Sequence, residues 1–151
     1  MPLIKSQRSP LNKAWLKIRQ REIDANLCHA FALMDKWPKA WEIDERDRRY
    51  GEDLLKELKP FVRYLAETKQ LARSTLRRHL NQLFLLGGEI ISTVNTHERD
   101  RHQPAARLLD KQLAPDGGPY CRHIDTDQHQ RQFDSTCRQL FAFRSTLNCD
   151  H

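Results

Sequence analysis

Apolar residues recur along this chain with the period of an α-helix. Over residues 11–36 they form one narrow stripe on a helical wheel, with Phe31 beside it. The stripe consists of Leu16, Ile23, Leu27, Ala30 and Met34. The dipeptide Trp37-Pro38 predicts the end of this helix. Trp37 and Trp41 bracket a short connector, and we expect their rings to seal the junction with the next helix.

A second helical pattern starts near Asp44 and carries three leucines before Pro60. Because proline removes a backbone donor and collides with the preceding turn, we expect a break or kink there. The mixed-charge run over residues 42–53 is typical of a solvated surface with exposed ion pairs of about 0.2–0.5 kcal/mol each, and we assign it no chemistry. Residues 61–68 resume the helix, and Lys69-Gln70 marks a short turn.

The next helix is expected to start at Ser74, whose side chain can accept a backbone N–H bond as a cap. It contains Gly87-Gly88, each costing about 1 kcal/mol relative to alanine in a helix interior. Either the glycines end the helix in a tight turn, or they stay helical because another element crosses close to the backbone. The apolar Ile90, Ile91 and Val94 that follow favour the second interpretation.

The remaining pattern predicts a loop over residues 95–103, a short helix opened by Pro104, and a turn over residues 115–119. A last helix follows over residues 128–147, with Asp127 as its cap. Period-two runs of β-branched residues are absent from the sequence, so any sheet is limited to one short hairpin. The fold class expected for these 151 residues is therefore all-α.

We expect one compact helical bundle without a second domain. Residues 1–43 form the long first helix and its connector, residues 44–95 the helices expected to meet DNA, and residues 96–151 the carboxy-terminal helices. The formal net charge of +6 favours an acidic partner such as nucleic acid. No signal peptide stands at the amino terminus and no segment approaches a membrane span, so a cytoplasmic location is expected.

The helix that follows residue 74 has a polar face rich in basic and amide side chains. Leu80, Leu83 and Phe84 share one sector of the wheel, whereas Arg78, Asn81 and Gln82 point the opposite way. Arginine and the amides pair bidentately with guanine or adenine edges in a major groove. The alternative is a solvated surface that is merely basic.

The order F-V-R-Y-L from residue 61, a short turn with Leu71, S-T-L from residue 74 and an amphipathic helix resembles the core-binding domain of tyrosine recombinases of the phage-integrase type. The resemblance spans residues 61–91. That domain is a small SAM-like helical unit that grips DNA opposite the catalytic domain. The resemblance implies that residues of the S-T-L segment lie near the sugar-phosphate backbone: Arg73, Ser74, Thr75, Arg77 and Arg78.

The catalytic set of a tyrosine recombinase is missing from the sequence. No histidine is followed three residues later by arginine, and the last tyrosine, Tyr120, stands beside a Pro/Gly turn without a partner motif. A phosphate loop, a G-x-S-x-G elbow and an H-E-x-x-H pair are also absent. We therefore expect a non-catalytic binding module without a cofactor, working alone or beside a recombinase encoded elsewhere.

A winged helix is an alternative for residues 71–91, with a recognition helix followed by the first wing strand. The spacing disfavours this alternative. A winged helix places another complete helix before the recognition helix, whereas only a few residues separate Leu65 from Ser74.

Cysteine and histidine residues in the last third raise the question of a metal site. The four cysteines are too widely spread for a disulfide framework, so reduced thiols are expected. A closed zinc site usually contains C-x2-C, but Cys121 and His123 leave one residue between them. Cys137 falls in a helical apolar register, which favours core packing, and a polar loop is the simpler account of Asp125 and its neighbours. The sequence does not decide whether a metal ligand is among the following residues: Cys121, His123, His129, Cys137, Cys149 and His151, with Asp125 and Asp127 beside them.

The function predicted from the sequence is DNA binding, with an accessory role in a mobile or integrative element. Lys69, Arg73, Arg77 and Arg78 would neutralise phosphates, and Asn81 and Gln82 would reach base edges. The alternative is a helical protein-interaction or oligomerisation module that docks a partner through an exposed Leu85 and through Phe143 of the last helix.

Overall fold

The computed structural model describes residues 10–149, with side chains described for residues 12–147. The described residues form an all-α fold without a strand; a single isolated bridge joins Ala114 and Gly117. In chain order the elements are α2 (Pro10–Met34), α3 (Trp37–Trp41), α4 (Glu45–Arg63), the π-helix η1 (Tyr64–Thr68), α5 (Arg73–Thr96), α6 (Glu98–Arg101), α7 (Ala105–Gln112) and α8 (Asp127–Cys149).

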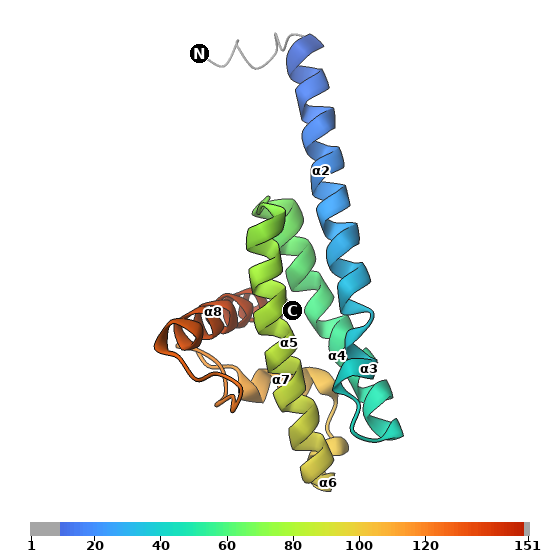
Figure 1. The fold of residues 1–151 in the computed structure, drawn as a ribbon, viewed down its shortest axis with the longest axis vertical. Coiled ribbons are helices and arrows are strands. Elements are labelled where there is room, and N and C mark those ends of the chain that lie inside the picture. The colour runs from blue at the N-terminus through green and yellow to red at the C-terminus, as the bar shows by residue number, and fades with distance from the viewer. Residues whose placement is uncertain (1–9, 150–151) are drawn as a thin grey trace.

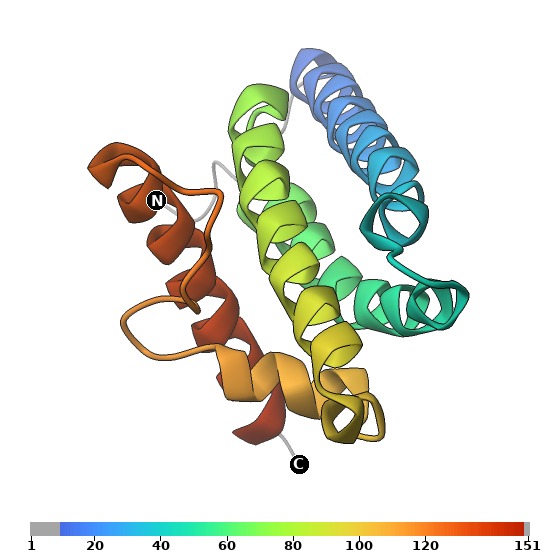
Figure 2. The same cartoon turned by 60° about the horizontal axis from the view of Figure 1, so that its bottom comes forward.

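Helix α5 is the centre of the bundle. It contacts α4, and it lies between α2 on one side and α8 on the other in both Figure 1 and Figure 2. Helix α7 crosses near the carboxy-terminal half of α5. The apolar stripe predicted for α5 is buried from Leu76 to Val94, and it meets the buried face of α4 in one continuous core.

Helix α2 confirms the first predicted helix, but only part of its apolar stripe is buried. Ile23, Leu27, Ala30 and Met34 lie in the core, whereas Leu16 is 41% exposed. Figure 1 shows the reason: the amino-terminal turns of α2 extend beyond the tip of the α4–α5 pair. The expectation that Leu16 packs inward is therefore wrong, because α2 has no neighbour among the described residues at that height.

Trp37 and Trp41 are buried between the first helix and α4, as predicted, and they also pack against α5, which was not predicted. The indole Nε1 of Trp41 donates a hydrogen bond to the carbonyl oxygen of Phe84 at 3.0 Å, and the two rings stack. The Trp41 ring lies on the backbone of Gly87, where a Cβ would be 2.5 Å from Cη2 and 2.8 Å from Cε2. This close approach explains why α5 stays helical through Gly87 and Gly88, and it confirms the second interpretation of the glycine pair.

The break expected at Pro60 is wrong, because α4 continues through Pro60 to its end at Arg63. Pro60 is exposed, while Leu58, Phe61 and Val62 are fully buried. Burial of each of these side chains contributes about 1.5–3 kcal/mol. The three together outweigh the roughly 3 kcal/mol cost of a helical proline. The chain then widens into η1, and Gln70, with φ of 52°, makes the turn into α5.

Two of the expected helix caps are also wrong. Helix α5 begins at Arg73 with Ala72 at its N-cap and no side-chain cap, so Ser74 lies inside the helix. At α8 the hydroxyl of Thr126, not Asp127, accepts the N–H of His129 at 3.1 Å. In both cases the helix begins one or two residues from the expected position, a shift that periodicity alone does not resolve.

Among the described helices, none combines the length and the apolar surface needed to cross a membrane.

Candidate nucleic-acid interface

The amino-terminal half of α5 separates apolar and cationic side chains cleanly. Leu76, Leu80 and Leu83 are buried, whereas Arg77, Arg78 and Asn81 are exposed on the outer side. The leucines recur every three or four residues, so the residues between them face solvent. Arg77 and Arg78, two of the basic side chains predicted from the sequence, therefore lie on the outer face of one helix.

Four cations predicted as phosphate contacts are exposed: Lys69, Arg73, Arg77 and Arg78. Within residues 12–147 none of the four forms an ion pair with a carboxylate. Arg73 donates from Nε to the amide oxygen of Asn26 on α2 at 3.0 Å. Arg78 lies 3.5 Å from the hydroxyl of Thr75. Their positive charge is not neutralised by a neighbouring acid.

The first turn of α5 adds a second positive feature. It has no side-chain cap and no acidic residue, so its backbone N–H groups lack a side-chain acceptor. Free N–H groups and the helix dipole together favour an anion at a helix amino terminus. Ser74 is exposed and Thr75 half-buried at this end, which puts both beside the cations.

Three adjoining hollows run beside these side chains, and together we call them the α5–α8 groove. The central hollow, of about 360 Å³, lies between α5 and α8. A second, of about 580 Å³, spans α2, α3, α5 and α8 and shares Arg78, Gln82 and Gln132 with the first. A third, of about 400 Å³, lies between η1 and α8 and shares Gln139 with the first. None of the described residues that line the groove is Asp or Glu.

The groove brings together most of the site residues predicted from the sequence. Lys69, Thr75, Arg77, Arg78, Asn81 and Gln82 line it. Arg73 and Ser74 line none of the three hollows. Gln82 is only 5% exposed, and its Oε1 lies 3.2 Å from Nε2 of His129. The expectation that Gln82 is free to reach a base edge is therefore wrong, because α8 covers it.

Helix α8 supplies the second wall, which the sequence analysis did not identify. Arg131 is exposed without an ion pair in the described part of the chain, and Gln128, Gln132 and Gln139 line the groove beside it. The amide-rich segment at the start of the last helix was the available signal. This segment is informative only together with the packing of α8 against α5.

A buried contact joins the two walls. Nδ1 of His79 lies 2.9 Å from the hydroxyl of the buried Thr136. Burial, with a contribution from the neighbouring Arg78, lowers the pKa of His79. The lowered pKa favours the neutral imidazole of His79, and the permanent positive charges of the groove are its arginines and Lys69.

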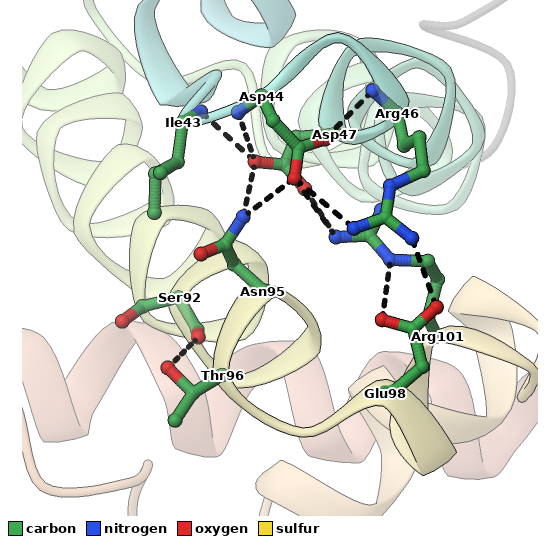
Figure 3. Close-up of polar contacts among 9 residues, drawn as sticks. All are labelled: Ile43, Asp44, Arg46, Asp47, Ser92, Asn95, Thr96, Glu98 and Arg101. Atoms are coloured by element: carbon green, nitrogen blue, oxygen red, sulfur yellow. Dashed lines mark hydrogen bonds and ion pairs between the residues drawn. The ribbon is translucent and has the colours of Figure 1, made fainter.

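A separate polar cluster surrounds Asp47, which is fully buried. Figure 3 shows its carboxylate accepting the backbone N–H groups of Ile43 and Asp44, each at 2.9 Å. Asn95 donates to it at 3.1 Å and Arg101 at 2.7 Å. Burial opposes the charge, but these hydrogen bonds outweigh it and lower the pKa of Asp47.

This cluster corrects the expectation that residues 42–53 form only a solvated surface. Exposed pairs are present, such as Arg46 with Glu98 at 2.9 Å, but Asp47 points inward and ties α4 to the end of α5 and to α6. The carboxylate oxygens of Asp47 are occupied by donors. The cluster is suited to holding the helices together rather than to moving protons.

The described cysteines form no disulfide bond with one another. Cys28 is exposed, and Cys121 and Cys137 are buried free thiols. Burial, then the nearby Asp134, raises the pKa of Cys137 to about 12, as expected for a core residue. Within the described residues no group of three or more Cys, His, Asp or Glu side chains could hold a metal ion. The side chain of Cys149 and all of His151 lie outside the described residues.

The docking residues expected for a protein partner are not exposed. Leu85 and Phe143 are both half-buried against the core, and Phe143 packs on Tyr64 with ring centroids 5.1 Å apart. The exposed apolar side chains of α2 are different ones: Trp15 (61%), Leu16 (41%) and Ile18 (54%).

Comparison of the chain with protein-family models, with curated proteins and with solved structures finds no match.

Proposed function

We propose that this protein binds DNA, without acting on it chemically, through the amino-terminal half of α5 and the turn before it. One observation carries the proposal: Lys69, Arg73, Arg77 and Arg78 are exposed at an uncapped helix end, and no carboxylate among the described residues pairs with them. A cation without an acidic neighbour is available to displace counterions from phosphates.

Two other arginines of the chain differ from these four cations. Arg144 pairs with Asp110 and Glu57, and Arg101 pairs with Asp47. These two guanidinium groups form ion pairs that link helices. Lys69, Arg77, Arg78 and Arg131 instead line one groove whose described walls contain no acidic residue, as expected for a surface that meets a polyanion.

The biological setting is part of the same proposal. The resemblance of residues 61–91 to the core-binding domain of tyrosine recombinases supports an accessory role in a mobile or integrative element, beside a recombinase supplied in trans. The free thiols of Cys28, Cys121 and Cys137 fit a reducing compartment such as the cytoplasm.

The test is a gel-shift titration on native and heat-denatured plasmid fragments at several salt concentrations. Binding should weaken steeply as salt rises, because phosphate contacts release counterions. Arg77→Glu or Arg78→Glu should weaken binding to all sequences at least about tenfold. Arg107→Glu, the same charge reversal on the exposed outside of α7, is the matched control and should stay within about twofold. Binding that is undetectable, or insensitive to salt, rejects the proposal.

A second candidate function rests on the exposed Trp15, Leu16 and Ile18 of α2, which suit a protein partner. Light scattering distinguishes the two functions. A mass that rises with concentration in the native chain but not in Trp15→Ala, together with no retention on heparin, favours the protein interaction over DNA.

A further inference from the structure

We propose that the α5–α8 groove binds a single-stranded polynucleotide. On this proposal α5 does not insert into the major groove of a duplex. This inference rests on the proposed function and deepens it by naming the form of the partner. It follows from the shape of the groove, from its length and from the side chains along it.

The first argument is steric. Asn81 and Gln82 line a hollow that has Leu33 and Trp37 on one side and His129 on the other. The major groove of B-DNA is about 12 Å wide, and one helix with its side chains is about 10–12 Å across. Helix α5 has α2 and α8 beside it in both views (Figures 1 and 2), and packed helices lie about 8–10 Å apart. Three helices side by side are wider than the major groove, so α2 and α8 would meet the phosphate backbones before the outer face of α5 reached the base edges.

A single strand has no such obstacle, because it enters the groove between the helices. The groove follows α8 from Gln128 to Leu147. At 1.5 Å per residue this part of α8 is about 29 Å long. That length suits the smallest single-strand sites, of about four nucleotides.

The side chains along the groove match the chemistry of a strand. Arg78 and Arg131 stand on opposite walls of the central hollow, where both reach the path of a phosphate backbone. Lys69 continues this charge into the third hollow, beside the half-buried rings of Tyr64 and Phe143. These two rings pack on each other with centroids 5.1 Å apart, so they give the third hollow an apolar floor.

The glutamines of the groove complete this picture. Gln128, Gln132 and Gln139 each carry a donor and an acceptor that an unpaired base edge can meet. In a duplex the Watson–Crick edges of the bases are already paired with each other. The mixture of arginine and amide side chains in one open groove therefore suits a splayed strand.

The inference is tested by fluorescence anisotropy on the full chain with three labelled probes. These are an oligothymidine and an oligouridine of about 15 nucleotides each, and a hairpin duplex with a comparable number of phosphates. The strands should bind at least about tenfold more tightly than the hairpin. Oligothymidine and oligouridine distinguish DNA from RNA as the source of the strand.

Charge reversal in the second wall provides the matched variants. Arg131→Glu should weaken strand binding about tenfold, whereas Arg107→Glu on α7 should stay within about twofold. Both residues are exposed and without ion pairs in the described structure, so unchanged circular dichroism is expected for both. Hairpin binding as tight as strand binding, with Arg131→Glu neutral, overturns the inference and leaves DNA binding in place. Absence of binding to every probe rejects both proposals.

Discussion

Replacing Gly87 by alanine tests the packing of Trp41 on α5. An added Cβ would lie 2.5 Å from Cη2 and 2.8 Å from Cε2 of Trp41, and nearer still to Cζ2, so the indole has to move. Overpacking of this kind costs about 1–3 kcal/mol. Moving the ring also endangers its 3.0 Å hydrogen bond to Phe84, worth about 1 kcal/mol. Alanine returns about 1 kcal/mol of helix propensity.

We therefore expect Gly87→Ala to lower the free energy of unfolding by about 1–3 kcal/mol. Gly88→Ala is the matched control, because its Cβ would lie 3.6 Å from Cδ1 of Trp41, an ordinary contact. That variant should gain about 0.5–1 kcal/mol, since alanine replaces glycine in a helix interior. The two neighbouring substitutions should change stability in opposite directions.

The assay is urea denaturation followed by far-ultraviolet circular dichroism, which does not depend on the fluorescence of the displaced indole. A double-mutant cycle with Trp41→Leu isolates the contact. In that background Gly87→Ala should become neutral or stabilising, because the ring that it strikes is gone. Equal effects of Gly87→Ala with and without Trp41, or the same sign for both glycines, would refute the reasoning.

Two further predictions concern ionisable groups in the core. The pKa of Asp47 is lowered by folding, so its contribution to stability is present above the unfolded value of about 3.9 and is lost as pH falls through the lower folded value. The urea midpoint should therefore drop between pH 5 and pH 3, and Asp47→Ala should cost about 3–5 kcal/mol at pH 7 and flatten that dependence; an unchanged slope would contradict the assignment. In a Cys149→Ser background, a disulfide reagent at pH 8 should modify Cys28 at once, whereas Cys121 and Cys137 should react only on unfolding, because both are buried and burial raises the pKa of each thiol; three equally fast thiols would show that the core is open.

The helices were predictable from the sequence because burial in a bundle imposes a period of 3.6 residues. That period correctly located α2, α5 and α8, and it identified the face of α5 that is buried. It also supported a helical path through Gly87 and Gly88. The all-α class and the exposure of Arg77 and Arg78 follow from the same pattern.

Periodicity did not reveal which elements would lie beside each face. Leu16 has the register of a core residue but lies where α2 extends beyond its neighbours, and Gln82 has the register of a surface residue but is covered by His129 of α8. Asp47 sits in a charged run and is nevertheless fully buried, because donors from residues 95 and 101 reach it only in the folded chain.

The amino-acid sequence by itself determined the long helices and the apolar side of each, since both depend on local spacing. The loop expected over residues 95–103 is wrong, because α5 runs to Thr96 and the short helix α6 (Glu98–Arg101) follows it. The tertiary structure decided the groove, because its two walls come from α5 and α8, which are distant along the chain. Whether an arginine is paired also depends on the tertiary structure, because a carboxylate neutralises it only if folding brings the two within a few ångströms. Folding does so for Arg101 and Arg144, but in the described structure it does not for Arg78 and Arg131.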